Sequence, residues 1–309
     1  MRAKVFNLFS LIAIVLCVSV VGCQKDYNPE VPEVPVVTDS TGTSINDSIY
    51  LDKVYYVDSI AGVRDTFAYD EYVYDANKRV IQLKLYEQEG SGVLELTHRN
   101  TYTYTGSDTL PSKRQLIYYP DDDTTITFFT YLPTGQNLTD STIHYANPNV
   151  PGSTTYTTVN HFSYVPGKIF NVVTASIPSF PVTVVGRDTM TVDAAMNITS
   201  YKSYQESGGT SMLQYNGNFT YSTSRSPYSL LSNFRTLLLV PFGETFIFDM
   251  QMYSNRLTSH EFYETLPSHD EDFTGAYRFG SNGLPSRIYE PYNPAFPDHY
   301  ITDFKYRSL

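Results

Sequence analysis

The sequence predicts an all-β protein, an antiparallel meander of about 16–18 strands made from hairpin repeats and curled, layered or barrel-like. Three observations lead to this fold class. The chain has 309 residues, with 28 Tyr, 18 Phe and no Trp. Aromatic residues recur at alternate positions before turns rich in Asp, Asn, Gly, Pro and Ser. Thr is abundant between the aromatics, as in 101–105, and both Thr and Tyr favour strands.

One motif accounts for the repeat. It consists of a large residue, an intervening residue and a second large residue, followed by a turn, and its second large residue recurs with a mean spacing of 29 residues. Residues at alternate positions project to one face of a strand, and the run after the turn alternates again, as in Ile81, Leu83 and Leu85. Each unit is therefore predicted to be a hairpin. The copies are Tyr72-Val73-Tyr74, Tyr102-Thr103-Tyr104, Phe129-Thr130-Tyr131, Phe162-Ser163-Tyr164, Met190-Thr191-Val192, Phe219-Thr220-Tyr221, Met250-Gln251-Met252, Tyr277-Arg278-Phe279 and Phe304-Lys305-Tyr306.

One segment interrupts the alternation. Residues 226–241 place apolar side chains at helical spacing, including Leu230, Leu231, Phe234 and Leu237. We expect a short helical or apolar insertion near residues 228–240. It would either cover the open face or end of the sheet, or act as a gate or partner-docking element.

The N-terminal segment reads as an export signal. Arg2 and Lys4 precede an apolar run that ends at Val20, Val21, Gly22 and Cys23. This ending resembles a bacterial lipobox, in which the Cys takes lipid. Residues 1–22 are thus predicted to be a lipoprotein signal peptide, 23–48 a lipidated Cys23 with a Pro-rich tether, and 49–309 the repeat domain. Gln24, Lys25 and Asp26 resemble the export tag of surface lipoproteins from Bacteroidetes.

The charge and the cysteine content exclude some classes of function. The formal net charge is -11, and removing Arg2 and Lys4 with the signal takes it to -13. An acidic chain is a poor nucleic-acid binder, because such binding needs a basic surface. Lipid on Cys23 would leave no thiol and would anchor the chain to the outer membrane without spanning it. The predicted location is the outer membrane, at the cell surface or on the periplasmic face.

Catalytic and metal motifs are scarce. The six histidines form no His-Glu-x-x-His pair, and the sequence has no Gly-x-Ser-x-Gly elbow. Two acidic clusters have oxygen ligands that suit Ca²⁺, but neither has the spacing of a calcium loop, so solvated turns are the alternative interpretation. The clusters are Asp121, Asp122, Asp123 and Asp270, Glu271, Asp272. No other cofactor is predicted.

The tyrosines are the most suggestive residues. Their rings stack on sugars or other planar ligands, and their hydroxyls form hydrogen bonds. Aligned tyrosines also form cross-strand ladders or a core that only stabilise a sheet. Both interpretations are open for the candidate ligand-binding residues Tyr72, Tyr74, Tyr102, Tyr104 and Tyr277.

The stretch Tyr72-Val73-Tyr74-Asp75-Ala76-Asn77-Lys78-Arg79-Val80-Ile81 resembles the YD repeat of Rhs-type shells, and Tyr253-Ser254-Asn255-Arg256-Leu257 is a partial second match. Rhs repeats are shorter than the units here, and most copies here lack the Asp. The hairpin rhythm is more similar to uncharacterised Bacteroidetes lipoproteins with YD-like hairpins. That resemblance implies β architecture and a surface location, and it implies no activity.

The leading hypothesis is a lipid-anchored envelope protein with a non-enzymatic binding or interaction role. One alternative is a module that captures a glycan or an apolar ligand for nutrient uptake, and a partner protein is a further possible ligand. Another is a glycan hydrolase, which would need two carboxylates that converge in space.

Overall fold

A computed structural model describes residues 49–309, apart from 61–62, 89–91, 120–122, 148, 150–151, 179–182, 195–196, 226, 232–254, 265–269, 275, 282–283 and 290–298. The predicted signal peptide, the Cys23 lipobox, the export tag and the tether lie outside the described residues. No helix among the described residues is long and apolar enough to cross a membrane.

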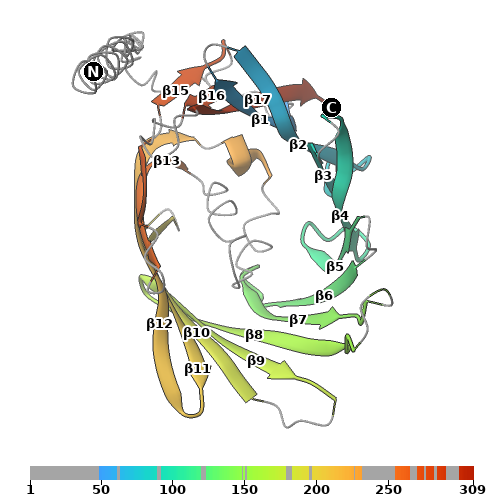
Figure 1. The fold of residues 1–309 in the computed structure, drawn as a ribbon, viewed down its shortest axis with the longest axis vertical. Helices are drawn as coiled ribbons and strands as arrows, with labels where there is room; N and C mark the ends of the chain where they lie inside the picture. The colour runs from blue at the N-terminus through green and yellow to red at the C-terminus, as the bar shows by residue number, and fades with distance from the viewer. Residues whose placement is uncertain are drawn as a thin grey trace, which may run out of the picture. The chain divides into compact units, whose positions relative to one another are not determined.

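Seventeen strands and one 3-10 helix make up the described chain, which confirms the predicted all-β class (Figure 1). In chain order the strands are β1 (Ile49–Ile60), β2 (Val63–Tyr74), β3 (Val80–Gln88), β4 (Leu94–Tyr104), β5 (Pro111–Tyr118), β6 (Asp123–Tyr131), β7 (Asn137–His144), β8 (Tyr156–Val165), β9 (Lys168–Ser176), β10 (Thr183–Val192), β11 (Ile198–Ser207), β12 (Thr210–Arg225), β13 (Asn255–Glu264), β14 (Asp270–Thr274), β15 (Ala276–Phe279), β16 (Pro285–Tyr289) and β17 (His299–Ser308). The 3-10 helix η1 spans Pro227–Leu230.

The strands form one antiparallel sheet in which most strands pair with their neighbours in the chain. The last strand, β17, also pairs with β1 through a long ladder that includes Val54 opposite Phe304. In Figure 1 the red β17 accordingly lies beside the blue β1 and β2. Among the described residues no ladder joins β14 to β15. The meander is therefore curled and not closed, and it is not split into layers.

One face of this sheet holds the core, and we call it the aromatic face. The first large residue of most motif copies is almost fully buried on it. These residues are Tyr72, Tyr102, Phe129, Phe162, Met190, Phe219 and Phe304. They fall into two apolar clusters, one around Leu51, Val54 and Tyr72, the other around Phe162, Met190 and Ile198.

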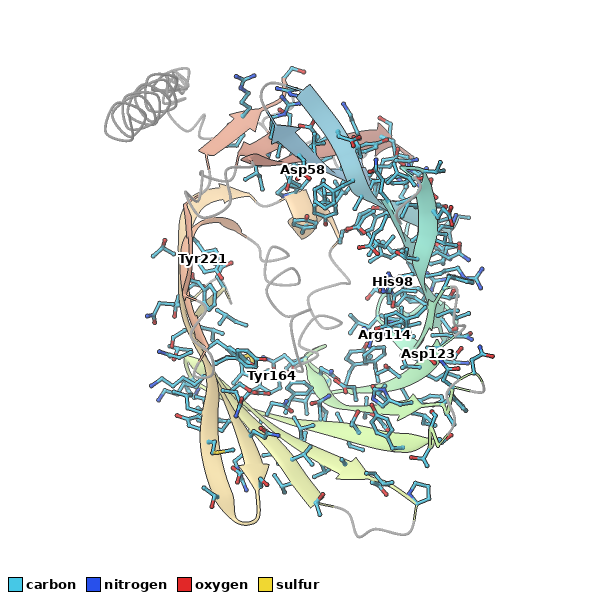
Figure 2. All side chains as sticks on the ribbon, in the orientation of Figure 1. Asp58, His98, Arg114, Asp123, Tyr164 and Tyr221 are labelled. Atoms are coloured by element: carbon cyan, nitrogen blue, oxygen red, sulfur yellow. The ribbon has the colours of Figure 1, made fainter. Side chains whose placement is uncertain are left out.

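In six copies the second large residue of the motif is a tyrosine, and it makes the same hydrogen bond each time. Its hydroxyl donates to a main-chain carbonyl near the start of the strand that precedes its own. The bonds run from Tyr74 to Leu51 (2.7 Å), Tyr104 to Val80 (2.6 Å), Tyr131 to Pro111 (2.7 Å), Tyr164 to Asn137 (2.7 Å), Tyr221 to Ile198 (2.7 Å) and Tyr306 to Pro285. Figure 2 shows Tyr164 and Tyr221 on this face. The 29-residue period therefore repeats a contact that ties each hairpin to the one before it.

The turns add a second link between units. Asp75 accepts hydrogen bonds from the main-chain N–H groups of Asn77 and Arg79, each 2.9 Å long, and pairs with the Arg79 side chain. Arg79 Nη1 then donates to the carbonyls of Gly106 and Asp108 in the next turn, both at 2.9 Å. The residues of the YD-like motif thus connect two successive turns.

The predicted insertion begins as the 3-10 helix. Tyr228 and Leu231 are buried against the first apolar cluster, and the Tyr228 ring meets the edge of Phe304 at 5.7 Å between centroids. This segment covers part of the aromatic face near β1 and β17, as a plug would. Most of the rest of the predicted insertion lies outside the described residues.

Candidate functional site

The tyrosines predicted to bind ligand lie mainly in the core. Tyr72 and Tyr102 are buried, and the hydroxyls of Tyr74 and Tyr104 are bonded to main-chain carbonyls. Tyr277 lies in β15, and its side chain is outside the description. These positions agree with the ladder-or-core interpretation, and a ligand contact by the five residues stays a prediction.

The aromatic face also contains a row of buried polar side chains, which ends within the second apolar cluster at Tyr201. Asn160 Nδ2 donates to Asp140 Oδ1 at 2.6 Å, and Asn171 Nδ2 donates to Asn160 Oδ1 at 3.1 Å and to Asp188 Oδ2 at 2.9 Å. Tyr201 completes the row with a 3.1 Å bond to the other oxygen of Asp188. The row joins β7 to β11, and none of its members is more than 3% exposed.

Burial dominates the electrostatics of this row. It raises the pKa of Asp140 to about 6, although hydrogen bonds from Asn160 and Asn137 and the charge of Arg114 act in the opposite direction. Burial likewise raises the pKa of Asp188. Because the amide and hydroxyl donors satisfy these carboxylates, the row resembles a structural network rather than a site open to a ligand.

A second group of titratable residues lies at the opposite end of the aromatic face. Tyr56 Oη donates to Asp70 Oδ2 at 2.9 Å, and burial, with a smaller contribution from Glu87, raises the pKa of Asp70 to about 7. Thr97 Oγ1 donates to Glu87 Oε2 at 2.6 Å, and His98 Nδ1 lies 3.7 Å from the same oxygen. The register of β2 and β3 places Asp70 and Glu87 on one face. Figure 2 shows His98 and Arg114 on this face as well.

The face opposite the core presents a different pattern, one that sequence analysis did not single out. Tyr55, Tyr69 and Tyr86 lie directly opposite one another on β1, β2 and β3. The Tyr55 and Tyr69 ring centroids are 5.5 Å apart, and the Tyr69 and Tyr86 rings stack at 4.5 Å with an interplanar angle of 11°. All three are partly exposed.

A charged row runs beside these tyrosines. Lys305, Lys53, Glu71, Lys84 and Arg99 are successive cross-strand partners from β17 to β4. Glu71 accepts from both neighbouring lysines, at 3.3 Å from Lys53 and 3.1 Å from Lys84. Burial opposes the shift, but these hydrogen bonds lower the pKa of Glu71 below its usual value. We call this row and the three tyrosines the basic–aromatic patch.

Further contacts order the side chains in and beside the patch. Lys53 Nζ lies 4.8 Å from the centroid of the Tyr69 ring, and the Arg99 guanidinium lies 5.7 Å from that of Tyr119. Arg287 and Asp303 form an ion pair next to Tyr55, because Asp303 is the cross-strand partner of Tyr55. The patch is therefore an ordered surface of the sheet with a net positive charge.

The two predicted acidic clusters are not part of the basic–aromatic patch. Of the first cluster only Asp123 is described, at the start of β6, opposite Tyr118. Asp270, Glu271 and Asp272 lie within β14 rather than in the solvated turn that was the alternative to a calcium site. Among the described residues no three His, Cys, Asp or Glu side chains gather in a way that could hold a metal ion. Calcium binding stays an untested prediction.

Comparison with known proteins finds no matching family model and no matching curated protein. Three solved structures with a similar chain trace come from Bacteroides species. A porin-like protein from Bacteroides vulgatus is 10% identical, with 84% of this chain and 99% of that chain covered and a TM-score of 0.49. A porin-like protein from Bacteroides uniformis is 13% identical over 83% and 96%, with a TM-score of 0.46. A protein of unknown function from Bacteroides fragilis is 10% identical over 48% and 89%, with a TM-score of 0.24.

Proposed function

We propose that the chain is a lipid-anchored protein of the cell envelope, displayed at the cell surface, that acts by binding and not by catalysis. The observation that supports binding is the basic–aromatic patch, an ordered and partly exposed surface formed by residues that are not needed to fill the core. The observation that supports anchoring is the ending Val20-Val21-Gly22-Cys23 of the apolar N-terminal run.

Lipid attachment is tested by metabolic labelling of cells with an alkyne fatty acid. The wild-type protein should be labelled, and the Cys23→Ser variant should lose the label while Cys17→Ser keeps it. A labelled Cys23→Ser protein would contradict anchoring at this residue. Brief protease treatment of intact cells then tests display: degradation of the folded domain supports the outer face, and protection until the cells are lysed contradicts it.

A glycan hydrolase is the second candidate, and the pair of Asp70 and Glu87 favours it. Glycoside hydrolysis uses one protonated and one ionised carboxyl group. Asp70 has a pKa of about 7, and the Glu87 side chain is 41% exposed. The test is turnover of a polysaccharide panel by the purified full-length protein and by Asp70→Asn and Glu87→Gln. Activity that is lost in both variants would establish this function, and no turnover by the wild-type protein would exclude it for that panel.

A further inference from the structure

The charged row of the patch, which we call the basic row, places like charges directly opposite each other. This arrangement does not favour folding. Lys305 is the direct cross-strand partner of Lys53, and Lys84 is that of Arg99. Like charges directly opposite each other destabilise a sheet. The row has four basic residues and one acidic residue, whereas the chain has 21 basic and 32 acidic residues. Basic residues are thus concentrated where they repel one another.

Glu71 neutralises only the middle of the row. Its two oxygens are used by Lys53 and Lys84, and no ion pair of Lys305 or Arg99 occurs in the part of the chain that the structure describes. Arg99 Nε is buried and has no hydrogen-bond partner among the described residues. The two ends of the row therefore retain positive charge that the ion pairs of Glu71 do not neutralise.

The row is longer than a small anion. Five strands at a spacing of about 4.8 Å extend over roughly 19 Å. The adjacent tyrosines follow the same direction on β1, β2 and β3, and each of the three is partly exposed. An extended polymer with repeated anionic groups and many hydroxyls matches both features, because its charges would meet the basic row and its sugar rings would meet the tyrosines.

We infer that the basic–aromatic patch binds an acidic polysaccharide, with Lys84, Arg99 and Lys305 contacting its anionic groups and the exposed parts of Tyr69 and Tyr86 contacting its sugar units. This inference rests on the proposed binding function, and it names the ligand class for that function. A surface location would bring such polymers within reach.

Binding is measured by calorimetry with full-length protein purified in a non-ionic detergent. The probes are polygalacturonate and fully methyl-esterified polygalacturonate, which has the same backbone without the charge. We expect binding to the first at low salt, at least tenfold weaker binding to the second, and strong weakening in 0.5 M salt, as charge contacts at an exposed surface require. Equal affinity for both polymers, or no binding to either, would overturn the inference.

Variants locate the site. The double variant Lys84→Gln, Lys305→Gln should bind roughly tenfold more weakly, because it removes two of the three basic side chains that the inference places on the anionic groups. A matched double variant, Lys168→Gln, Lys202→Gln, removes two exposed lysines of β9 and β11 and should bind like wild type. Wild-type affinity in the first variant, or an equal loss in the second, would contradict the assignment to this patch.

The single variant Lys305→Gln shows whether a loss of binding is caused by a loss of folding. It removes an exposed lysine and relieves the repulsion of Lys53, so its melting temperature should stay the same or rise while binding weakens.

Vesicles with anionic lipid and duplex DNA are tested in parallel, and preferential binding to either would replace the polysaccharide as the ligand. Lipid labelling of Cys23 is a separate measurement. A failure of the proposed anchoring can therefore be distinguished from a failure of the proposed polysaccharide binding.

Discussion

The hydroxyl of Tyr74 donates a 2.7 Å hydrogen bond to the main-chain carbonyl of Leu51, 23 residues earlier in the chain. The same bond recurs from Tyr104, Tyr131, Tyr164, Tyr221 and Tyr306. It explains why the second position of the motif is so often tyrosine. Phe fills a similar volume but leaves the carbonyl without this donor.

Removing one of these hydroxyls should therefore destabilise the sheet. We expect Tyr104→Phe and Tyr164→Phe each to lower the free energy of unfolding by about 1–2 kcal/mol, the cost of leaving a partly buried carbonyl unpaired. Tyr145→Phe is the control, because Tyr145 is 45% exposed. Chemical denaturation measures the change. Equal stability of all three variants and the wild-type protein would show that the hydroxyl bonds contribute nothing.

We predict that a lysine cannot replace Arg79 without a loss of stability. Its guanidinium pairs with Asp75, donates to Gly106 and Asp108, and lies 4.5 Å from the centroid of the Tyr104 ring. A lysine ammonium cannot reproduce this set of planar contacts. Arg79→Lys should cost about 1–2 kcal/mol in thermal or chemical unfolding. Retention of wild-type stability in Arg79→Lys would mean that charge alone matters at this position.

The buried polar row should depend on Asn171, because its amide joins Asn160 to Asp188. Replacing it with Leu keeps much of the volume and removes both bonds, which leaves a buried carboxylate with fewer donors. We predict that Asn171→Leu lowers the unfolding free energy by about 2–4 kcal/mol. Lys168→Ala, an exposed substitution on the same strand, should change it little. A stable Asn171→Leu protein would indicate that the row is dispensable.

Asp140 should make stability depend on pH. Its pKa in the folded chain is about 6, above the usual value of 3.8, so its contribution is fully present below pH 3.8 and is lost as the pH rises through 6. Between pH 5 and 7.5 this loss is about 1 kcal/mol. Burial lowers the pKa values of His98 and His144, which produces the opposite slope.

The Asp140→Asn variant isolates this contribution. The histidines are unchanged in it, so its stability should fall less than that of the wild-type protein between pH 5 and 7.5, or should rise more. The measurement is the free energy of unfolding at the two pH values for each protein. The same pH response in both would contradict the raised pKa of Asp140.

Much of the fold was predictable from sequence because it depends on local patterns. Strand alternation has a period of two, and the turn residues mark the hairpin ends, so the number of strands and the buried face of Tyr72 and Tyr102 follow from neighbouring residues. The ladder between β1 and β17 joins residues about 250 positions apart, and no local pattern specifies it. Curling was expected from accumulated twist.

The candidate site was harder to predict. Tyr55, Tyr69 and Tyr86 become neighbours only through the register of three strands, and a register shift between Tyr56 and Val57 lies beside the first of them. A slip of one residue would move each ring to the opposite face. The basic row has the same origin, because Lys305 and Lys53 are opposite each other only once β17 has returned to β1.

The most direct test of this account compares stability and binding in two variants side by side. The account holds that the motif tyrosines stabilise the sheet from its aromatic face and that the opposite face binds ligand. Tyr104→Phe should lose stability and bind polygalacturonate as the wild-type protein does, whereas Lys84→Gln, Lys305→Gln should change its melting temperature little and bind roughly tenfold more weakly. The reverse result, with binding lost in Tyr104→Phe and kept in the lysine variant, would contradict the account.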